Sequence, residues 1–339
     1  MPRRWLSGSS ASQAAMSVCD TSSDRYSIID PVRYTVVLGA PRSGTSLLMG
    51  VLDAMPDTEC VQGNLLPPSI PQIAAHDLPH PIRDALVSAF SMAIQDHLSS
   101  GVYWSRSAAI RKWVAAQDGV REVARTLRGE RSAERFIYKE PFFSFAPWYP
   151  YEALPEARLV YLVRDGRDVA DSLVRTYDVL TDEKLAALST NEAPLGRQYD
   201  DRYVPWWVED GTEQDFLSAT PFVRAIWMWR EMVRRCQAFF SQAEVSSSGR
   251  VFVVRYEELV REPLVTGTAV AEHIGGPLTR RMTKRLLTAH DRSIGIHRQR
   301  DAGQVRAAER VAGSELASLG YSDAKRRVDR DRASALVAV

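Results

Sequence analysis

Eight residues near the start of the chain, Gly39-Ala40-Pro41-Arg42-Ser43-Gly44-Thr45-Ser46, have the composition of an anion-binding loop. Gly39 and Gly44 have the spacing of the glycines in a P-loop, and glycine lets the backbone approach an anion closely. Amides at the start of a helix point at such an anion, and Thr45 and Ser46 add hydroxyl donors. We therefore expect a phosphate or sulfate group at this loop.

The cation of the loop distinguishes it from a loop that binds ATP. An ATP-binding P-loop has a lysine directly after its second glycine, followed by Ser or Thr for Mg²⁺. Thr45 occupies that lysine position here, and the loop carries Arg42 two residues before Gly44. The sequence therefore predicts an anion site without the lysine and magnesium pair, and we expect no metal.

Arg164 and Ser172 are a second candidate anion site. Arg164 follows the apolar run 158–163, so it should leave a buried strand at the sheet edge where α/β proteins bind ligands. Ser172 lies two helical turns further on. A guanidinium binds phosphate through two parallel hydrogen bonds, and a serine adds a donor. The alternative interpretation is a helix start with surface charges.

Short apolar runs that alternate with helical patterns should position these residues. Strands are predicted at 34–38, 136–138, 158–163 and 251–256. Helices are predicted at 45–55, 165–177 and 220–243, and two more lie between 81 and 128 with a break near 99–101. This alternation predicts a three-layer α/β/α fold with a central, mainly parallel sheet and a P-loop-like phosphate-binding loop.

A single domain is expected over residues 31–325. Residues 1–30, rich in Ser and Ala, predict a disordered leader, and 326–339 a tail. Four prolines make 62–80 a predicted loop. Residues 179–215 predict a variable insertion on the side of the site where a second substrate would bind.

Composition narrows the class of protein. The chain has 339 residues, 45% of them hydrophobic and 25% charged, which is ordinary for a globular protein. Its formal net charge of +1 gives no overall field for nucleic acid or a membrane surface, and no apolar run reaches the roughly 18 residues of a membrane span. Three scattered cysteines form neither a disulfide framework nor a metal motif. We expect a cytoplasmic protein without a nucleic-acid partner.

Several blocks of the sequence resemble, in family order, the sulfotransferases that use 3′-phosphoadenosine 5′-phosphosulfate (PAPS). They are residues 40–48, 52–57, 138–142, 162–172, 254–259, 293–295 and 319–321. The first block is similar to the 5′-phosphosulfate loop of the protein-tyrosine and carbohydrate branch, where Arg replaces the Lys of cytosolic members. The block that ends at Ser172 resembles the family's 3′-phosphate motif.

The resemblance implies in-line transfer of a sulfuryl group from PAPS to a hydroxyl or amine of a small-molecule, carbohydrate or lipid acceptor, without metal. The product of the donor would be 3′-phosphoadenosine 5′-phosphate (PAP). Lys139 would contact the leaving oxygen, with Arg42 sharing this task, because a fixed cation there stabilises the transition state. The expected donor-binding residues are Arg42, Ser43, Gly44, Thr45, Ser46, Arg164, Ser172, Tyr256, Ser293, Gly295 and Arg298.

Neither of the family's general-base positions holds its usual residue. The glutamate of the tyrosine-sulfating branch would fall near Gln62-Gly63-Asn64, and the histidine that follows the lysine of cytosolic members is replaced by Glu140. Local candidates are His76, His80, Glu59 and Glu140. His76 is preferred because the proline-rich loop should border the acceptor, and a surface histidine is the alternative. A phenol or an amine acceptor would need a base less.

Aromatic residues outside the matched blocks suggest where the acceptor binds. Trp104, Trp113, Trp206 and Trp207 predict an acceptor pocket with an apolar or sugar-like face, or satellite packing. Trp227 and Trp229 lie on a predicted helix and favour packing. Tyr256 at a strand end suggests adenine or phosphate contact, or core packing. His297 is interpreted as a surface residue.

Two other functions fit parts of the sequence. A P-loop small-molecule kinase that uses ATP fits the glycine loop, but Thr45 and the Arg164–Ser172 pair oppose it. An inactive nucleotide-binding protein fits the missing base, but Lys139 and Arg42 oppose it. The expected acceptor is a small molecule, such as a secondary metabolite of natural-product biosynthesis or a glycan. The sequence leaves its identity and the oligomeric state open.

Overall fold

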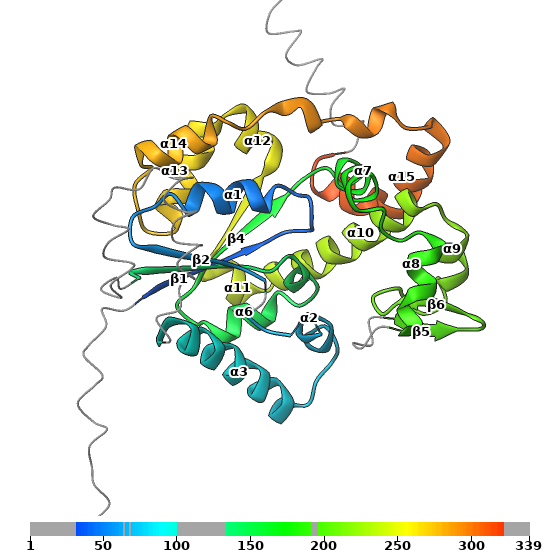
Figure 1. The fold of residues 1–339 in the computed structure, drawn as a ribbon, viewed down its shortest axis with the longest axis horizontal. Helices are drawn as coiled ribbons and strands as arrows, with labels where there is room; N and C mark the ends of the chain where they lie inside the picture. Colours follow the sequence, from blue (N-terminus) through cyan, green and yellow to red (C-terminus); the bar gives the residue numbers. More distant parts are fainter. Residues whose placement is uncertain (1–31, 64, 68, 100–132, 191–195, 322–339) are drawn as a thin grey trace, which may run out of the picture. The chain divides into compact units, whose positions relative to one another are not determined.

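The computed structural model describes residues 32–63, 65–67, 69–99, 133–190 and 196–321. Its centre is a five-stranded parallel sheet with the strand order β2-β3-β1-β4-β7 (Figure 1). The strands are β1 (Arg33–Leu38), β2 (Thr58–Gln62), β3 (Arg135–Lys139), β4 (Arg158–Val163) and β7 (Val251–Arg255). All five carboxyl ends therefore meet at one edge, and the predicted α/β fold with a central parallel sheet is confirmed.

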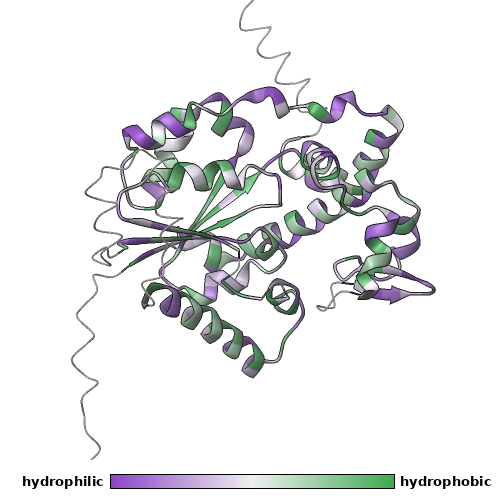
Figure 2. Cartoon of the chain, viewed as in Figure 1, coloured by the Kyte–Doolittle hydropathy of each residue, from purple (hydrophilic) through white to green (hydrophobic). Residues whose placement is uncertain are grey.

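Helices cover both faces of the sheet, because successive strand residues point to opposite sides. Val37 and Leu162 pack with α1 (Thr45–Leu52), α12 (Tyr256–Arg261), α13 (Pro263–His273) and α14 (Arg280–Leu286). Val36 and Tyr161 pack with α3 (His80–Ser99), α6 (Trp148–Ala153) and α10 (Pro221–Phe240) on the other face. Figure 2 shows hydrophobic strands between helices whose outer faces are hydrophilic.

A third apolar cluster extends the fold beyond the carboxyl edge of the sheet. It joins α7 (Gly166–Tyr177), α10 and α15 (Ala302–Ser318), and it includes Trp207. Next to Trp207 in the chain is the two-stranded hairpin of β5 (Gly196–Tyr199) and β6 (Arg202–Pro205), which does not pair with the central sheet. This cluster supports the elements that border the candidate site.

The structure differs from the predictions in several elements. The first helix ends at Leu52, not Met55, and Tyr256 begins α12 where a strand end was expected. Strand β2 was missed because Glu59 and Gln62 interrupt its apolar pattern at the sheet edge. The predicted loops contain α2 (Ile70–Ala74), α8 (Asp182–Ala186), α9 (Glu213–Ser218) and the β5–β6 hairpin. Tertiary packing stabilises these short elements where local pattern alone is weak.

The remaining elements are short. They are the 3₁₀ helices η1 (Pro141–Phe145), η2 (Ala187–Thr190), η3 (Asp291–Ser293) and η4 (Ile296–Gln299), and α11 (Ala243–Ser247). The predicted leader, the predicted helix beyond residue 100 with Trp104 and Trp113, and the predicted tail 326–339 lie outside the described residues. Among the described helices, none is both long and apolar enough to cross a membrane.

Candidate active site

The glycine loop connects the carboxyl end of β1 to the start of α1. Gly39 has φ +143°, and a Cβ there would lie 2.4 Å from the carbonyl oxygen of Leu162. Gly44 has φ +99°, and a Cβ there would lie 2.4 Å from the ring of Tyr256. Both positions therefore exclude side chains. The first amides of α1 have no partner within the helix, so they are available to an anion.

Arg42 links this loop to the second candidate anion site. Its Nε donates to the hydroxyl of Ser172 at 3.0 Å, and Nη1 donates to the hydroxyl of Tyr177 at 3.4 Å. Its backbone carbonyl accepts from Nη1 of Arg164 at 3.0 Å. Arg42 also has φ +70°, which costs a non-glycine residue on the order of 1 kcal/mol. In this structure the Arg42 side chain thus contacts Ser172, although the sequence suggested a task shared with Lys139.

Arg164 is buried, with 4% of its surface exposed, at the end of β4. Its Nη2 donates to the carbonyl of Ser293 at 2.6 Å, and its guanidinium lies over the ring of Tyr256 at 4.5 Å. The hydroxyls of Tyr256 and Ser293 are 3.1 Å apart. The structure thus brings together five of the predicted donor-binding residues: Arg42, Arg164, Ser172, Tyr256 and Ser293.

Two buried polar atoms beside these residues lack a hydrogen-bond partner within the described part of the chain. They are Nε of Arg164 and Oγ of Ser43. A buried polar group without a partner costs about 1–3 kcal/mol, so native structures rarely keep one. Both atoms belong to predicted donor-binding residues, Ser43 in the glycine loop and Arg164 after β4, so both places carry hydroxyl or guanidinium donors of the kind that an anion requires.

Lys139 ends β3 directly beside β1, where it pairs in register with Val37. Its Nζ donates to Ser46 Oγ at 3.0 Å and to Gln62 Oε1 at 3.2 Å. Only 8% of the residue is exposed, and burial lowers the pKa of its ammonium although nearby Glu140 opposes the shift. The ammonium therefore lies at the first turn of α1, on the loop side of the sheet edge.

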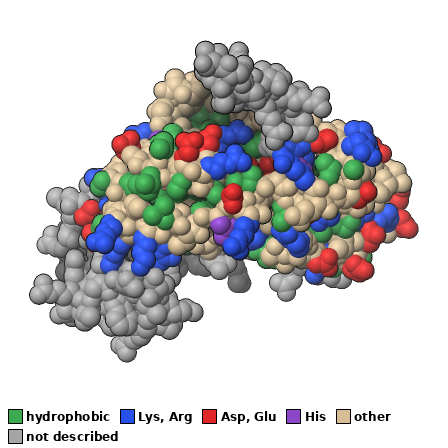
Figure 3. All heavy atoms as spheres, turned by 90° about the horizontal axis from the view of Figure 1, so that it is seen from above, with side chains coloured by type: hydrophobic (Ala, Val, Ile, Leu, Met, Phe, Trp, Pro, Cys, Tyr) green, Lys and Arg blue, Asp and Glu red, His purple; other side chains and the backbone are tan. Residues whose placement is uncertain are grey.

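The positive charge of the site comes from Arg42, Lys139 and Arg164 and not from a uniformly basic surface. Figure 3 shows Lys and Arg side chains interspersed with Asp and Glu side chains on one face of the described molecule. This agrees with the formal net charge of +1. Arg42, Lys139 and Arg164 come from three separate segments that end at the same sheet edge, so the fold gathers charge that the composition does not reveal.

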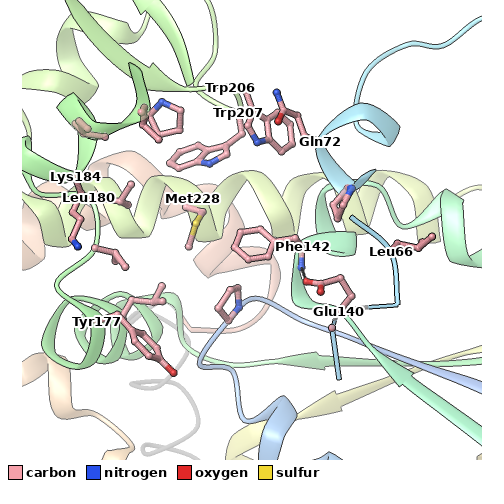
Figure 4. A pocket seen from close by; sticks show the side chains of 18 residues that line it. Leu66, Gln72, Glu140, Phe142, Tyr177, Leu180, Lys184, Trp206, Trp207 and Met228 are labelled. Carbon is pink, nitrogen blue, oxygen red and sulfur yellow. Dashed lines mark hydrogen bonds between the residues drawn. The ribbon is translucent and has the colours of Figure 1, made fainter. Parts of the chain in front are cut away.

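A cavity of about 620 Å³ opens beside the loop, and Pro41 and Glu140 both line it (Figure 4). Burial raises the pKa of the Glu140 carboxyl, against weaker opposite effects of the Phe142 amide and Lys139. Glu140 Oε1 accepts a 3.1 Å hydrogen bond from the Phe142 amide, which caps η1. A Cβ at Gly63 would lie 3.6 Å from Glu140 Oε2. The Glu140 carboxylate thus lies beside Gly63, where the glutamate base of the tyrosine-sulfating branch was expected to fall.

The other base candidates lie elsewhere. His76 lines a separate hollow with Arg83 and Trp148, and its ring packs 5.9 Å from that of Trp206. Glu59 is buried 3.3 Å from His97 Nε2. His80 is exposed at the start of α3. The proline-rich loop does border the cavity, through Gly63, Leu66, Pro71 and Gln72, but His76 is not among the residues that line it.

A buried histidine closes the segment after Ser293, contrary to the predicted surface position of His297. His297 is 3% exposed, and its Nδ1 lies 2.5 Å from Asp168 Oδ1. The Gly295 amide donates to Asp168 Oδ2 at 2.7 Å. Burial alone would raise the pKa of Asp168, but these hydrogen bonds outweigh it and lower the pKa. Arg298 is exposed beside Gly295.

Sequence reasoning missed Asp168 and the residues behind it. Glu257 accepts hydrogen bonds from the Asp165 amide at 3.1 Å and from the Tyr321 hydroxyl at 2.8 Å. Arg167 donates to Asp165 and to the carbonyl of Tyr321. The signal was the density of charged residues on α7, whose first turns are fully buried although their sequence is polar. These contacts fix the start of α7, and hence Arg164 and Ser172.

Of the four tryptophans for which the sequence left a pocket or satellite packing open, Trp206 and Trp207 lie within the described residues. Trp206 and Trp207 line the cavity. Trp227 and Trp229 are buried in the third apolar cluster, at 7% and 1% exposure, and pack in the core. Trp206 and Trp207 are therefore both cavity residues, and Trp207 also packs in the third apolar cluster.

A family model described as the sulfotransferase family matches residues 35–280, and the chain therefore belongs to the sulfotransferase family. A protein-tyrosine sulfotransferase of Drosophila melanogaster is 30% identical over 136 residues, which are 40% of this chain and 24% of that protein. The match thus spans about a quarter of the length of that relative.

Three solved structures match most of this chain at low sequence identity. The sulfotransferase domain of the Synechococcus PCC 7002 olefin synthase is 17% identical, covers 84% of this chain and 96% of its own, and has a TM-score of 0.42. A sulfotransferase from Mycobacterium avium is 16% identical, with 86% and 78% covered and a TM-score of 0.44. A mouse sulfotransferase complexed with PAP is 12% identical, with 89% of both chains covered and a TM-score of 0.42.

Proposed function

We propose that this sulfotransferase takes its sulfuryl group from PAPS and transfers it to a hydroxyl group in the cavity beside Glu140. The supporting observation is the placement of the cations. Lys139 contacts Ser46 at the start of α1, whereas Arg42 contacts Ser172 and Arg164 contacts the Arg42 carbonyl, and this separation supports two anion sites at the sheet edge. PAPS has two anionic ends, a 5′-phosphosulfate and a 3′-phosphate, and ATP lacks the second.

The two sites have distinct parts in this proposal. The amides at the start of α1, with Ser43, Gly44, Thr45 and Ser46, hold the 5′-phosphosulfate. Arg164 and Ser172 hold the 3′-phosphate, because a guanidinium and a hydroxyl are its natural donors. Tyr256, Ser293, Gly295 and Arg298 complete this end. The Arg42–Ser172 hydrogen bond supports the proximity of the two ends.

The transfer step needs no redox partner. The acceptor oxygen attacks the sulfur in line, a new S–O bond forms, and the bond from sulfur to the 5′-phosphate oxygen breaks. The leaving oxygen keeps the electron pair, and the Lys139 ammonium stabilises this charge. The acceptor proton passes to the Glu140 carboxylate and then to solvent. The products are PAP and a sulfate ester.

Glu140 is the proposed general base because its side chain lies on the cavity side of the end of β3, whereas the side chain of Lys139 lies on the donor side. Lys139 Nζ contacts Ser46 on the donor side, whereas Glu140 lines the cavity with Pro41 of the loop. An acceptor hydroxyl in the cavity therefore lies between a carboxylate and the loop that carries the sulfate. A carboxyl whose pKa is raised by burial is also a stronger base than an ordinary glutamate.

We propose a small-molecule acceptor, as in natural-product biosynthesis, and a cytoplasmic location. The three cysteines are too sparse for a disulfide framework, and the described Cys60 and Cys236 are both buried, which is typical of a protein in a reducing compartment. This proposal requires no metal, since the cations of the site are side chains.

Calorimetric titration of the full chain with PAP, and separately with ATP and Mg²⁺, tests the donor. We expect PAP to bind and ATP with Mg²⁺ to bind at least tenfold more weakly, because ATP offers nothing to Arg164 and Ser172. Tight ATP binding without any response to PAP would overturn the proposal in favour of a P-loop kinase.

A further inference from the structure

We infer that the acceptor is a hydroxyl compound with an apolar body, and not a sugar or a peptide. The inference rests on the proposed function, since it assumes that the cavity beside Glu140 receives the acceptor. It concerns the walls of that cavity, which come from the glycine loop, the residues after β2, α2, the start of η1, α7, α8, η2, α10 and the end of β6 with the two residues after it.

The walls of the cavity are almost entirely apolar. The side chains labelled along it in Figure 4 include Leu66, Phe142, Leu180, Trp206, Trp207 and Met228. Among its 18 lining residues, charged or amide side chains occur only at Gln72, Glu140 and Lys184. A sugar carries a hydroxyl on most of its carbons and a peptide carries an N–H and a C=O at each residue, and these groups would lose water here without a partner in return. Such an acceptor is therefore disfavoured by the walls themselves.

The two charged side chains of the lining lie at opposite ends of the cavity, and Gln72 lies near Trp206 and Trp207. Figure 4 shows Glu140 near Leu66 at one end and Lys184 near Leu180 at the other, with Phe142 and Met228 between them. Lys184 is exposed, so this end meets solvent. A molecule with one hydroxyl and an apolar body matches this order, with the hydroxyl at Glu140 and the body along α10.

The size of the cavity suits such a molecule. About 620 Å³ lies inside the range of roughly 300–1,000 Å³ that is usual for pockets that enclose drug-sized ligands. Phe142, Trp206 and Trp207 offer ring faces, while Leu180 and Met228 offer flexible aliphatic surface. Both an alkyl chain and a fused aromatic ring system would contact these walls favourably, and the experiment below distinguishes between them.

The test uses the full chain saturated with PAP, titrated calorimetrically with primary alkanols of increasing length, with 2-naphthol and with maltose. We expect affinity for the alkanols to rise about fourfold with each added methylene until the cavity is full, because each one leaves water for an apolar wall. We expect maltose not to bind. Tight 2-naphthol binding with weak alkanol binding would support the inference and would show that the apolar body of the acceptor is a ring system.

Two results would overturn the inference and leave the proposed function intact. They are normal PAP binding combined with maltose binding that exceeds alkanol binding, or alkanol affinity that does not depend on length. Failure of PAP itself to bind would instead overturn the proposed donor. The two failures are distinguishable because PAP binding is measured first.

A matched pair of variants assigns the effect to the cavity. Met228→Gln keeps the size of the side chain but adds an amide to the apolar wall, whereas Met92→Gln makes the same change at a residue that is 66% exposed on α3. We expect Met228→Gln to weaken alkanol binding at least tenfold, with PAP affinity and melting temperature as controls for folding. We expect Met92→Gln to leave alkanol binding and PAP affinity unchanged. Equal alkanol affinity in the two variants would contradict the inference.

Discussion

The Nε of Arg42 donates a hydrogen bond to Ser172 Oγ at 3.0 Å, across 130 residues of sequence. This hydrogen bond joins the loop after β1 to α7, the helix after β4. The Arg42 carbonyl reinforces the link by accepting from Arg164. Donor binding should therefore depend on residues that come from two different βα units.

Ser172→Ala should weaken PAP binding by about tenfold or more, because a hydrogen bond to a charged group contributes roughly 1.5–3 kcal/mol. The same variant should hardly change the binding of adenosine 5′-phosphosulfate, which lacks the 3′-phosphate. Calorimetric titration of both ligands measures the difference. Equal weakening of the two would show that Ser172 does not contact the 3′-phosphate.

Lys139→Ala should lower kcat by on the order of 10²- to 10³-fold, because the leaving oxygen loses a preorganised cation. PAP affinity should change by less than about threefold, since the first amides of α1 remain. The exposed residue Lys284 on α14 provides the control, and Lys284→Ala should leave kcat unchanged. An unchanged kcat in Lys139→Ala would refute the role assigned to Lys139.

The pH dependence of kcat/KM should have two limbs. Activity should rise as Glu140 loses its proton, at a pH above the ordinary glutamate value of 4.5 because burial raises this pKa. It should fall as Lys139 loses its proton, at a pH below 10.5 because burial lowers that pKa. Initial rates over a range of pH at low acceptor concentration measure both limbs.

Glu140→Gln should abolish the acidic limb and lower kcat by about 10²-fold, the usual size of general-base catalysis. The amide oxygen can still accept from the Phe142 amide, so η1 should keep its cap. Glu258→Gln changes a carboxylate that is 58% exposed on α12 and should keep the wild-type profile. An acidic limb that survives in Glu140→Gln would assign the base to another group.

Asp168→Asn should lower the free energy of unfolding by about 3 kcal/mol near pH 7, because it disrupts a buried, hydrogen-bonded pair with His297. The folded-state pKa of Asp168 is lowered, so its contribution to stability is present above the unfolded value of about 4 and is lost as the pH falls through the folded value. Urea unfolding of both proteins should therefore show a difference that shrinks in acid. Asp291→Asn, at an exposed position nearby, is the control. A difference that grows in acid would contradict this account.

The sequence predicted the sheet and its anion-binding edge because local signals there are strong. Gly39 and Gly44 have backbones that only glycine adopts easily, and Arg164 follows an uninterrupted apolar strand. Strand β2 is different, since its place in the sheet depends on pairing with β3, which no local pattern reveals.

The candidate base shows the same limit at a single residue. His76 and Glu140 both lie in segments that border the cavity, but only Glu140 lines it, and His76 packs instead beside Trp206, 130 residues further along the chain. His297 was taken for a surface residue because its partner, Asp168, lies 129 residues away. Contacts of this range are set by the packed fold, and periodicity does not encode them.

The β5–β6 hairpin is a separate two-stranded sheet, whereas the donor residues stand at the edge of the central one. The cavity residues on α8 and after β6 therefore lie outside the strands at whose ends Arg42, Lys139 and Arg164 stand. For protein engineering this makes the chain partly modular, with a constant donor module and a variable acceptor wall. Libraries aimed at new acceptors should vary the cavity residues Val179, Leu180, Lys184, Leu188 and Trp206, and should leave the sheet edge and the core residues Leu185 and Trp207 untouched.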